Sequence, residues 1–309
     1  MAEKILMVLA AGLGSRYGGM KQVDPVGPNG EIIMDYSVYD ALRHGFSKVI
    51  FIIREETREI FHESIGAKLE KYIEVEYVFQ KDSDLPDKLM VEVERSRPWG
   101  TGHAVFTARD HVRSPFAVIN ADDFYGEETF RKLSEALDEI EGKNGMAAMV
   151  SFPVERTLTE NGSVSRGICQ IDEEEFLIDV IEKTKIQEEH GQIINLHENG
   201  GKEIIEPGTL VSMNVWGFAP EFFALLEGEM VKFLTNQKTN LQKDEFYLPF
   251  AVNSLIHEGK LRVKARESDE NWFGVTYRED KAHVRESISA KIDEGKYPEN
   301  LWEEIWTKN

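Results

Sequence analysis

Short apolar runs separated by amphipathic stretches define the first half of the chain. The apolar runs cover residues 5–11, 48–53, 74–79, 116–120 and 146–152. Between them, apolar positions recur at helical spacing over residues 35–44, 55–69, 101–108 and 127–141. Parallel strands read as nearly continuous apolar runs because both of their faces are covered. The alternation therefore predicts a parallel sheet with covering helices.

The pattern changes after residue 153. Turn signals at Asn161-Gly162, Asn199-Gly200-Gly201 and Pro207-Gly208 separate short alternating runs, which is typical of antiparallel hairpins. We therefore expect an antiparallel ribbon added to the sheet. The remaining expected elements are strands at 176–181, 210–219 and 261–265, and helices at 221–234, 245–257 and 280–294.

The last residues carry four large apolar side chains: Tyr297, Leu301, Trp302 and Trp306. Exposed aromatic surface is costly, so this tail is expected to dock on the body or on a partner chain. A homo-oligomer is therefore an open alternative.

Charge and cysteine content narrow the function classes. The formal net charge of −20 over 309 residues disfavours nucleic-acid and membrane-surface partners, so an anionic substrate would need local cations or a metal. Cys169 is the only cysteine, which fits a reducing cytoplasm. No apolar run is long enough to span a bilayer, and residues 1–4 do not resemble a secretion signal.

A glycine-rich loop follows the first apolar run. Residues 12–19 hold four glycines, and Arg16 and Lys21 supply two cations. Backbone N–H groups in such a loop form an anion-binding nest, and the paired cations favour a polyphosphate. A P-loop is excluded because Met20 stands where its Lys belongs, and a dinucleotide loop because Tyr17 replaces its third Gly. The loop therefore predicts a triphosphate cradle, with an ordinary strand-to-helix turn as the alternative.

Asp122 and Asp123 directly follow the strand at 116–120. The carboxyl ends of parallel strands share one edge, so these side chains should face the cradle. A carboxylate opposite a triphosphate implies a divalent cation between them, and Mg²⁺ is held in this way by one or two carboxylates plus phosphate oxygens. We expect Asp122 to be the metal ligand. Capping of the helix that starts near residue 127 is the alternative.

Three weaker signals complete the candidate site. Gly100 and Thr101 enter a helix, where free N–H groups and small residues could accommodate a flat base or simply form a turn. Glu182-Lys183 follow the predicted strand at 176–181, where Lys183 could neutralise a phosphate or only be solvated. Asn214 lies within an apolar strand and needs partners, either a ligand hydroxyl or a core hydrogen bond.

Together these segments resemble the sugar-nucleotide pyrophosphorylases, which join an NTP to a sugar 1-phosphate. Residues 9–16 followed by Lys21-Gln22 fit the signature L-A-A-G-x-G-[ST]-R with P-K or K-Q, and residues 121–126 are similar to the segment G-D-N-x-F-Y-G. The resemblance implies an α/β fold: a Rossmann-like three-layer α/β/α architecture with a mixed, mostly parallel central sheet and an added antiparallel ribbon. It also implies one continuous catalytic domain, with a nucleotide-binding half at 1–152. The sugar-phosphate-binding half and the C-terminal helices then occupy 153–309.

The resemblance also implies roles for individual residues. Arg16, Lys21 and Asp122 become catalytic residues, and Lys183, Glu182 and Asn214 become sugar-phosphate-binding residues. The implied nucleotide-binding residues are Leu9, Ala10, Ala11, Gly12, Gly14, Ser15, Gln80, Gly100 and Thr101.

The implied cofactor is Mg²⁺, with Asp122 as its ligand. The family's second ligand, usually Asp or Asn, is replaced here by Thr276, so Asp269, Asp280 or a water could substitute. Residues 100–105 read G-T-G-H-A-V, which is most similar to the corresponding segment of uridylyl- and thymidylyltransferases. This similarity implies that the nucleotide is UTP or dTTP. The short loop between Arg16 and Lys21 favours a cytidylyltransferase acting on phosphocholine or another small phosphorylated alcohol. Thr276 also leaves open a nucleotide-sugar binding protein with impaired catalysis.

Overall fold

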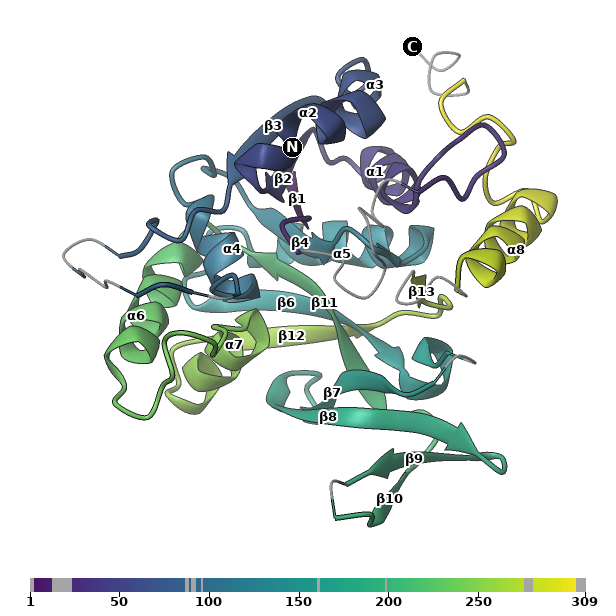
Figure 1. Cartoon of the computed structure of the whole chain (residues 1–309). Coiled ribbons are helices and arrows are strands. Elements are labelled where there is room, and N and C mark those ends of the chain that lie inside the picture. Colours follow the sequence, from purple (N-terminus) through teal and green to yellow (C-terminus); the bar gives the residue numbers. More distant parts are fainter. Residues whose placement is uncertain are drawn as a thin grey trace.

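A sheet of eleven strands runs through the computed structural model, which describes residues 3–12, 24–86, 89, 93–95, 97–159, 162–197, 199–274 and 280–303 (Figure 1). Its strands are β1 (Ile5–Leu9), β2 (Lys48–Ile53), β3 (Glu74–Phe79), β4 (Phe116–Asn120), β6 (Met146–Pro153), β7 (Val164–Ile171), β8 (Leu177–Glu189), β9 (Gln192–Leu196), β10 (Lys202–Ile205), β11 (Leu210–Phe218) and β12 (Arg262–Glu267). A separate antiparallel pair joins β5 (Asp123–Phe124) to β13 (Phe273–Gly274).

The central strands follow the order β3-β2-β1-β4, and all of their pairings are parallel. β11 lies antiparallel to β4 and to β6, and β12 extends the sheet in parallel to β6. β7 to β10 form an antiparallel ribbon that leaves the sheet beside β11 (Figure 1). The expected mixed, mostly parallel central sheet with an added ribbon is confirmed.

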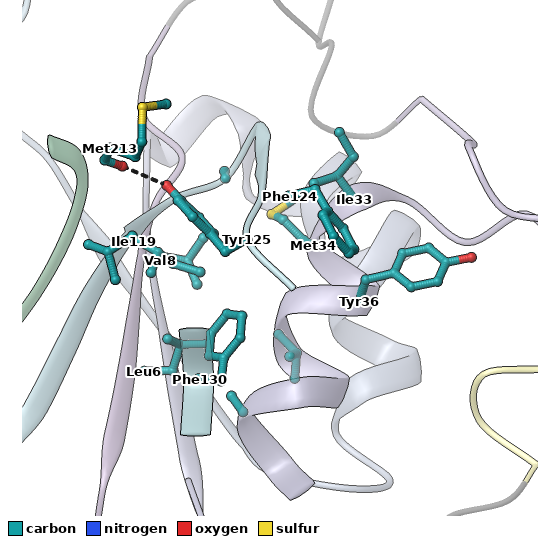
Figure 2. Close-up of a cluster of buried hydrophobic side chains, with 14 of the residues drawn as sticks. Leu6, Val8, Ile33, Met34, Tyr36, Ile119, Phe124, Tyr125, Phe130 and Met213 are labelled. Carbon is teal, nitrogen blue, oxygen red and sulfur yellow. Dashed lines mark hydrogen bonds between the residues drawn. The ribbon is translucent and has the colours of Figure 1, made fainter. Parts of the chain in front are cut away.

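Helices cover both faces of the sheet. One core cluster joins α1 (Ile33–Arg43), α5 (Glu127–Ile140) and α8 (Asp280–Asp293) to one side, and the other joins α4 (Thr101–Thr107), α6 (Phe222–Thr235) and α7 (Leu248–His257) to the opposite side. β1 shows why its strand is wholly apolar: Leu6 and Val8 enter the first cluster, which Figure 2 shows, while Ile5 and Met7 enter the second.

The helix expected over 55–69 is divided into short pieces. A 3₁₀ turn (Glu55–Thr57) leads into α2 (Arg58–Phe61), a π-helical turn (His62–Gly66) and α3 (Ala67–Leu69). Gly66 faces Tyr77 of β3 so closely that a Cβ atom would lie 1.6 Å from the Tyr77 hydroxyl oxygen. This close approach accompanies the wide turn, and a larger residue at position 66 would require the Tyr77 side chain to move.

β8 is longer than the sequence pattern predicts. The expected strand ends at residue 181, whereas β8 continues to Glu189 because it pairs with β7 on one side and β9 on the other. The prediction that Glu182 and Lys183 stand at a strand end was therefore wrong. They lie within the ribbon, and the alternation of a strand sends their side chains to opposite faces.

The C-terminal tail docks on α1. Tyr297, Leu301 and Trp302 are buried, and the Tyr297 hydroxyl donates to the Asp40 carboxyl at 2.6 Å. The Trp302 indole N–H donates to the buried Asp35 carboxylate at 3.2 Å. The described part of the tail therefore packs on its own chain, which was one of the two expected alternatives. Trp306 lies outside the described residues. In the described part of the chain, no helix has the length and apolar character needed to cross a membrane.

The buried Asp40 makes stability depend on pH. Loss of solvent raises the pKa of Asp40 well above its usual value, and its Oδ1 atom has no hydrogen-bond partner among the described residues. A carboxyl whose pKa is raised by folding lowers the free energy of unfolding as pH increases from about 4 towards the raised pKa. Asp40→Asn removes this ionisation. The free energy of unfolding of this variant should equal that of the wild type at acidic pH. It should exceed the wild-type value by about 1–3 kcal/mol at the upper end of the pH range over which Asp40 ionises.

Urea unfolding of both proteins across this pH range measures the difference. A difference that stays constant with pH would show that Asp40 does not titrate in this way.

Candidate functional site

A cavity of about 560 Å³ lies between the start of β7 and the end of β4, beside β11. It combines residues from the end of β4, from the ribbon, from β11 and from the start of α7. The lining residues are Thr101, Asn120, Asp122, Asp123, Ser165, Arg166, Gly167, Val180, Glu182, Thr184, Ser212, Met213, Asn214, Tyr247, Pro249, Phe250 and Trp272. Four of the site residues predicted from the sequence therefore line the same cavity: Thr101, Asp122, Glu182 and Asn214.

Asn214 stands at the point where β11 changes partner. β11 pairs with β7 at Val211 and Ser212 but with β4 from Trp216 onward, and its register against β6 shifts between these points. Asn214 has φ 60°, a left-handed conformation that Asn tolerates better than most residues. Because of this bulge, the Asn214 side chain faces the end of β4.

A continuous hydrogen-bond network fixes this corner. The Trp216 indole donates to Asn214 Oδ1 at 2.9 Å, and Asn214 Nδ2 donates to Asn120 Oδ1 at 2.7 Å. Asn120 Nδ2 then donates to the Asp123 carboxylate at 2.8 Å. Asn214 thus makes core hydrogen bonds and also lines the cavity, so its two predicted roles are compatible.

Tyr125 closes the network. Its hydroxyl lies 3.1 Å from Asp123 Oδ2 and 3.1 Å from the Met213 carbonyl oxygen, the contact that Figure 2 draws. Burial, reinforced by Asp123, raises the pKa of Tyr125 well above its usual value, so the hydroxyl keeps its proton and can donate. The Asp123 carboxylate is therefore used within the protein framework, and both Asp123 and its neighbour Asp122 line the cavity.

The described residues that were expected to bind a nucleotide begin at the end of β1. Leu9 is paired with Asn120 of β4 and Ile52 of β2, and the Ala10 N–H donates to the Ile52 carbonyl oxygen at 2.8 Å. Ala11 is buried and Gly12 is exposed at the start of the loop. This arrangement brings the end of β1 beside the end of β4. The predicted residues Gly14, Ser15, Arg16 and Lys21 lie outside the described residues.

Gln80 is held in one orientation by its neighbours. Its Nε2 donates to the Gly100 carbonyl oxygen at 3.1 Å and to His103 Nδ1 at 2.9 Å. His103 Nε2 lies 2.8 Å from the Asp84 carbonyl oxygen, which can only accept, so the imidazole carries its proton on Nε2. Burial lowers the pKa of His103 and keeps it neutral. The Gln80 carbonyl oxygen has no donor among the described residues and can accept from a ligand.

Packing requires the glycines at the start of α4. Gly100 has φ 105°, and a Cβ atom there would lie 2.7 Å from the Phe246 carbonyl oxygen. Gly102 packs against the same residue. Thr101 Oγ1 accepts the Leu248 N–H at 3.0 Å, which attaches α4 to the start of α7. The turn therefore has a structural role at Gly100, whatever it contributes to a nucleotide.

Lys183 is not brought to the cavity wall. Its ammonium lies 2.7 Å from the Glu203 carboxylate of β10, whereas Val180, Glu182 and Thr184 line the cavity. Loss of solvent raises the pKa of Glu182, and Arg166 opposes that shift. The ribbon therefore presents Glu182 to the cavity.

Arg166 is a site residue that the sequence reasoning missed. It lies on β7, is 9% exposed, and its guanidinium stacks 4.5 Å from the centre of the Trp272 ring. Arg166 shares the buried side of its strand with Val164, while Ser165 between them is exposed. A charged residue at an inward position of an alternating run was the available signal.

Asp269 and Asp280 do not line the cavity that Asp122 lines. Asp280 is buried, accepts a hydrogen bond from Thr159 at 3.3 Å and lines a neighbouring cavity of about 590 Å³. Asp269 is exposed, 3.6 Å from Lys132, and Thr276 lies outside the described residues. Among the described residues, no group of three or more His, Cys, Asp or Glu side chains could hold a metal. A metal site at Asp122 would be completed by ligand oxygens or by residues outside the described part of the chain.

Comparisons with known proteins agree with this architecture. A family model described as nucleotidyl transferase matches residues 5–275. Curated protein sequences give no match.

Two solved structures share the fold. A Bacillus anthracis protein described as a glucose-1-phosphate thymidylyltransferase, in complex with sucrose, is 16% identical with a TM-score of 0.61 over 92% of this chain and 94% of that chain. A UDP-glucose pyrophosphorylase complexed with UDP-glucose is 16% identical with a TM-score of 0.60 over 94% of this chain and 100% of that chain. The expected nucleotide-diphospho-sugar transferase type of fold is confirmed.

The bulge at Asn214 can be tested by two substitutions. Asn214→Ala and Asn214→Gly both remove the bonds to Asn120 and Trp216, but only Gly adopts a positive φ without strain. We expect the free energy of unfolding of the Gly variant to be about 1 kcal/mol higher than that of the Ala variant, so the Gly variant is the more stable one. Chemical denaturation measures this, and equal stabilities would argue against backbone strain at this position.

Proposed function

This chain belongs to the nucleotidyl transferase family, and we propose that it transfers a nucleotidyl group from UTP or dTTP to a sugar 1-phosphate, releasing pyrophosphate. The observation that carries the proposal is the cavity shared by Asp122, Glu182 and Asn214 at the carboxyl edge of the sheet. Ligands bind at this edge in open α/β sheets. The edge also joins the end of β1, from which the glycine-rich loop departs.

The proposed reaction needs little acid–base chemistry from the protein. An acceptor phosphate oxygen attacks the α-phosphorus in line and forms a new P–O bond. The bond from the α-phosphorus to the bridging oxygen breaks, and pyrophosphate leaves with the electron pair. Because the nucleophile is already an anion, no general base is required, and the protein contributes positioning and charge neutralisation.

Asp122 would hold Mg²⁺ together with oxygens of the triphosphate. One carboxylate plus phosphate oxygens is a common magnesium environment, and the exposure of Asp122 to the cavity is compatible with it. The ion when bound supplies charge neutralisation at the phosphates. We assign Arg16 to the triphosphate and Lys21 to the leaving pyrophosphate or the α-phosphate. On a chain of net charge −20, such local cations are needed to attract a polyphosphate.

The orientation of Gln80 supports a base that offers an N–H donor. Both amide hydrogens of Gln80 are donated within the protein, to Gly100 and His103, so its carbonyl oxygen is the group left for recognition. Uracil and thymine carry such a donor at N3, which agrees with UTP or dTTP.

A second candidate function rests on two exposed aromatic side chains. Tyr247 and Phe250 line the cavity, are 40% and 55% exposed, and have ring centres 5.8 Å apart. Aromatic faces beside a carboxylate such as Glu182 also bind quaternary ammonium groups. Transfer from CTP to phosphocholine is therefore the alternative reaction.

Asp122→Asn tests the metal assignment. The amide keeps the shape of the side chain but loses the charge that would attract Mg²⁺, so we expect pyrophosphate release to fall by at least about 100-fold. Urea unfolding should show a change within about 0.5 kcal/mol, as for a substitution outside the core. Near-normal turnover by the folded variant would contradict the role of Asp122.

Substrate choice can be measured directly. Five NTPs are each paired with glucose 1-phosphate, another hexose 1-phosphate or phosphocholine in the presence of Mg²⁺, and pyrophosphate release is followed. We expect UTP or dTTP with a sugar 1-phosphate to give the highest kcat/KM. A preference for CTP with phosphocholine would select the alternative reaction, and nucleotide binding without pyrophosphate release from any pair would indicate a binding protein.

A further inference from the structure

We propose that Arg166, held against Trp272, binds the phosphate group of the acceptor substrate. This inference rests on the proposed function for the identity of the acceptor, a phosphomonoester. It assigns the phosphate to a side chain of β7 instead of Lys183 of β8, whose ammonium lies 2.7 Å from Glu203. Either a sugar 1-phosphate or phosphocholine supplies the same phosphate.

Arg166 is a buried cation without a nearby carboxylate among the described residues. The side chain is 9% exposed, and no carboxylate of the described residues lies within ion-pair distance. Burial lowers the pKa of Arg166 to about 10, although Asp123 and Glu182 oppose this from farther away. The guanidinium therefore remains charged at neutral pH. A buried cation without an adjacent anion is costly, and a bound phosphate would compensate it.

The hydrogen-bond capacity of Arg166 is only partly used. Nε donates to the Thr157 hydroxyl at 3.1 Å, Nη1 to the Ser165 carbonyl oxygen at 2.8 Å, and Nη2 to the Thr157 carbonyl oxygen. A guanidinium has five N–H groups, so each terminal nitrogen keeps one without a partner among the described residues. Planar guanidinium groups of this kind bind phosphate oxygens well.

Trp272 makes the orientation of the guanidinium rigid. The indole ring of Trp272 stacks against the guanidinium, and Trp272 is 8% exposed. The main-chain N–H of Trp272 donates to the Arg156 carbonyl oxygen at 3.1 Å. The indole Nε1 is buried and has no hydrogen-bond partner among the described residues. The stack thus contains a second unused donor in a residue that also lines the cavity.

The position of Arg166 favours the acceptor over the nucleotide. β7 is separated from β1 by β11 and β4, which is roughly 14 Å at the usual spacing of strands. Asp122 follows β4, between the two sides. Arg166 is also the sole Lys, Arg or His among the described residues that line this cavity, whereas Asp122, Asp123 and Glu182 supply negative charge. A phosphomonoester entering here needs that cation.

The test separates binding of the two substrates. Arg166→Lys keeps the charge but loses the planar fork, so we expect the KM for the acceptor to rise at least about tenfold, with the KM for the NTP within about twofold of wild type. The matched control is Arg262→Lys, because Arg262 is also stacked on an aromatic ring, that of Phe176 at 3.8 Å, but outside the cavity. It should change neither constant.

Trp272→Phe is the second variant, in case Arg166→Lys does not fold. It keeps an aromatic platform but weakens the cation–π contact and removes the indole N–H, so a rise of about threefold in acceptor KM alone is expected. A rise confined to the NTP constant, or no change in a folded Arg166→Lys protein, would overturn the proposal. So would a rise in acceptor KM on Lys183→Ala that Arg166→Lys does not share.

Equilibrium binding distinguishes failure of this inference from failure of the proposed function. Calorimetric titration with glucose 1-phosphate, with phosphocholine and with unphosphorylated glucose requires no turnover. Binding of either phosphomonoester to the wild type, weakened at least tenfold in Arg166→Lys, supports the role of Arg166 even if no NTP is consumed. Equal binding by both proteins rejects it even if turnover is observed, and so does an absence of phosphomonoester binding to the wild type.

Discussion

The hydrogen-bond network from Trp216 through Asn214 and Asn120 to Asp123 is the constraint on which the rest of the site depends. It connects β11 to β4 just beyond Trp216, where the backbone pairing of these two strands ends, so side-chain hydrogen bonds continue the connection. Every member is buried or half-buried, and an unpaired polar group there would be costly. The network thereby fixes the segment that carries Asp122 without using Asp122 itself in any of these bonds.

The buried ionisable side chains of the protein differ in how far neighbouring groups compensate their charge. Burial raises the pKa of Asp35, but Lys68 at 2.6 Å and the Trp302 indole at 3.2 Å oppose that shift. Asp40, one turn further along α1, receives one bond from Tyr297 and has a strongly raised pKa. Arg166 receives hydrogen-bond acceptors but no adjacent carboxylate from the described residues. The first arrangement pairs a buried charge within the protein, whereas the last leaves a cation at a cavity.

Much of the fold was predictable because burial on both faces leaves a strong pattern in the sequence. β2, β3 and β4 lie where their apolar runs predict, and α5 and α8 differ from prediction by one residue at one end. β8 was underestimated because its last residues are half polar and are held by neighbouring strands, which a local pattern does not reveal. Asp122, Glu182 and Asn214 do share a cavity as the motifs suggested. The orientations of Lys183 and Arg166 could not be predicted, since each depends on strand register.

The change of partner along β11 has a consequence for how such a protein can diversify. The half of β11 that pairs with β4 belongs to the framework of parallel strands, and the half that pairs with β7 carries the ribbon. One bulged residue separates the two halves. Insertions, deletions or exchanges within residues 164–205 would alter one side of the cavity while leaving the parallel strands in place. The bulge thus lets one strand join a framework and a ribbon whose lengths and sequences can change independently of each other.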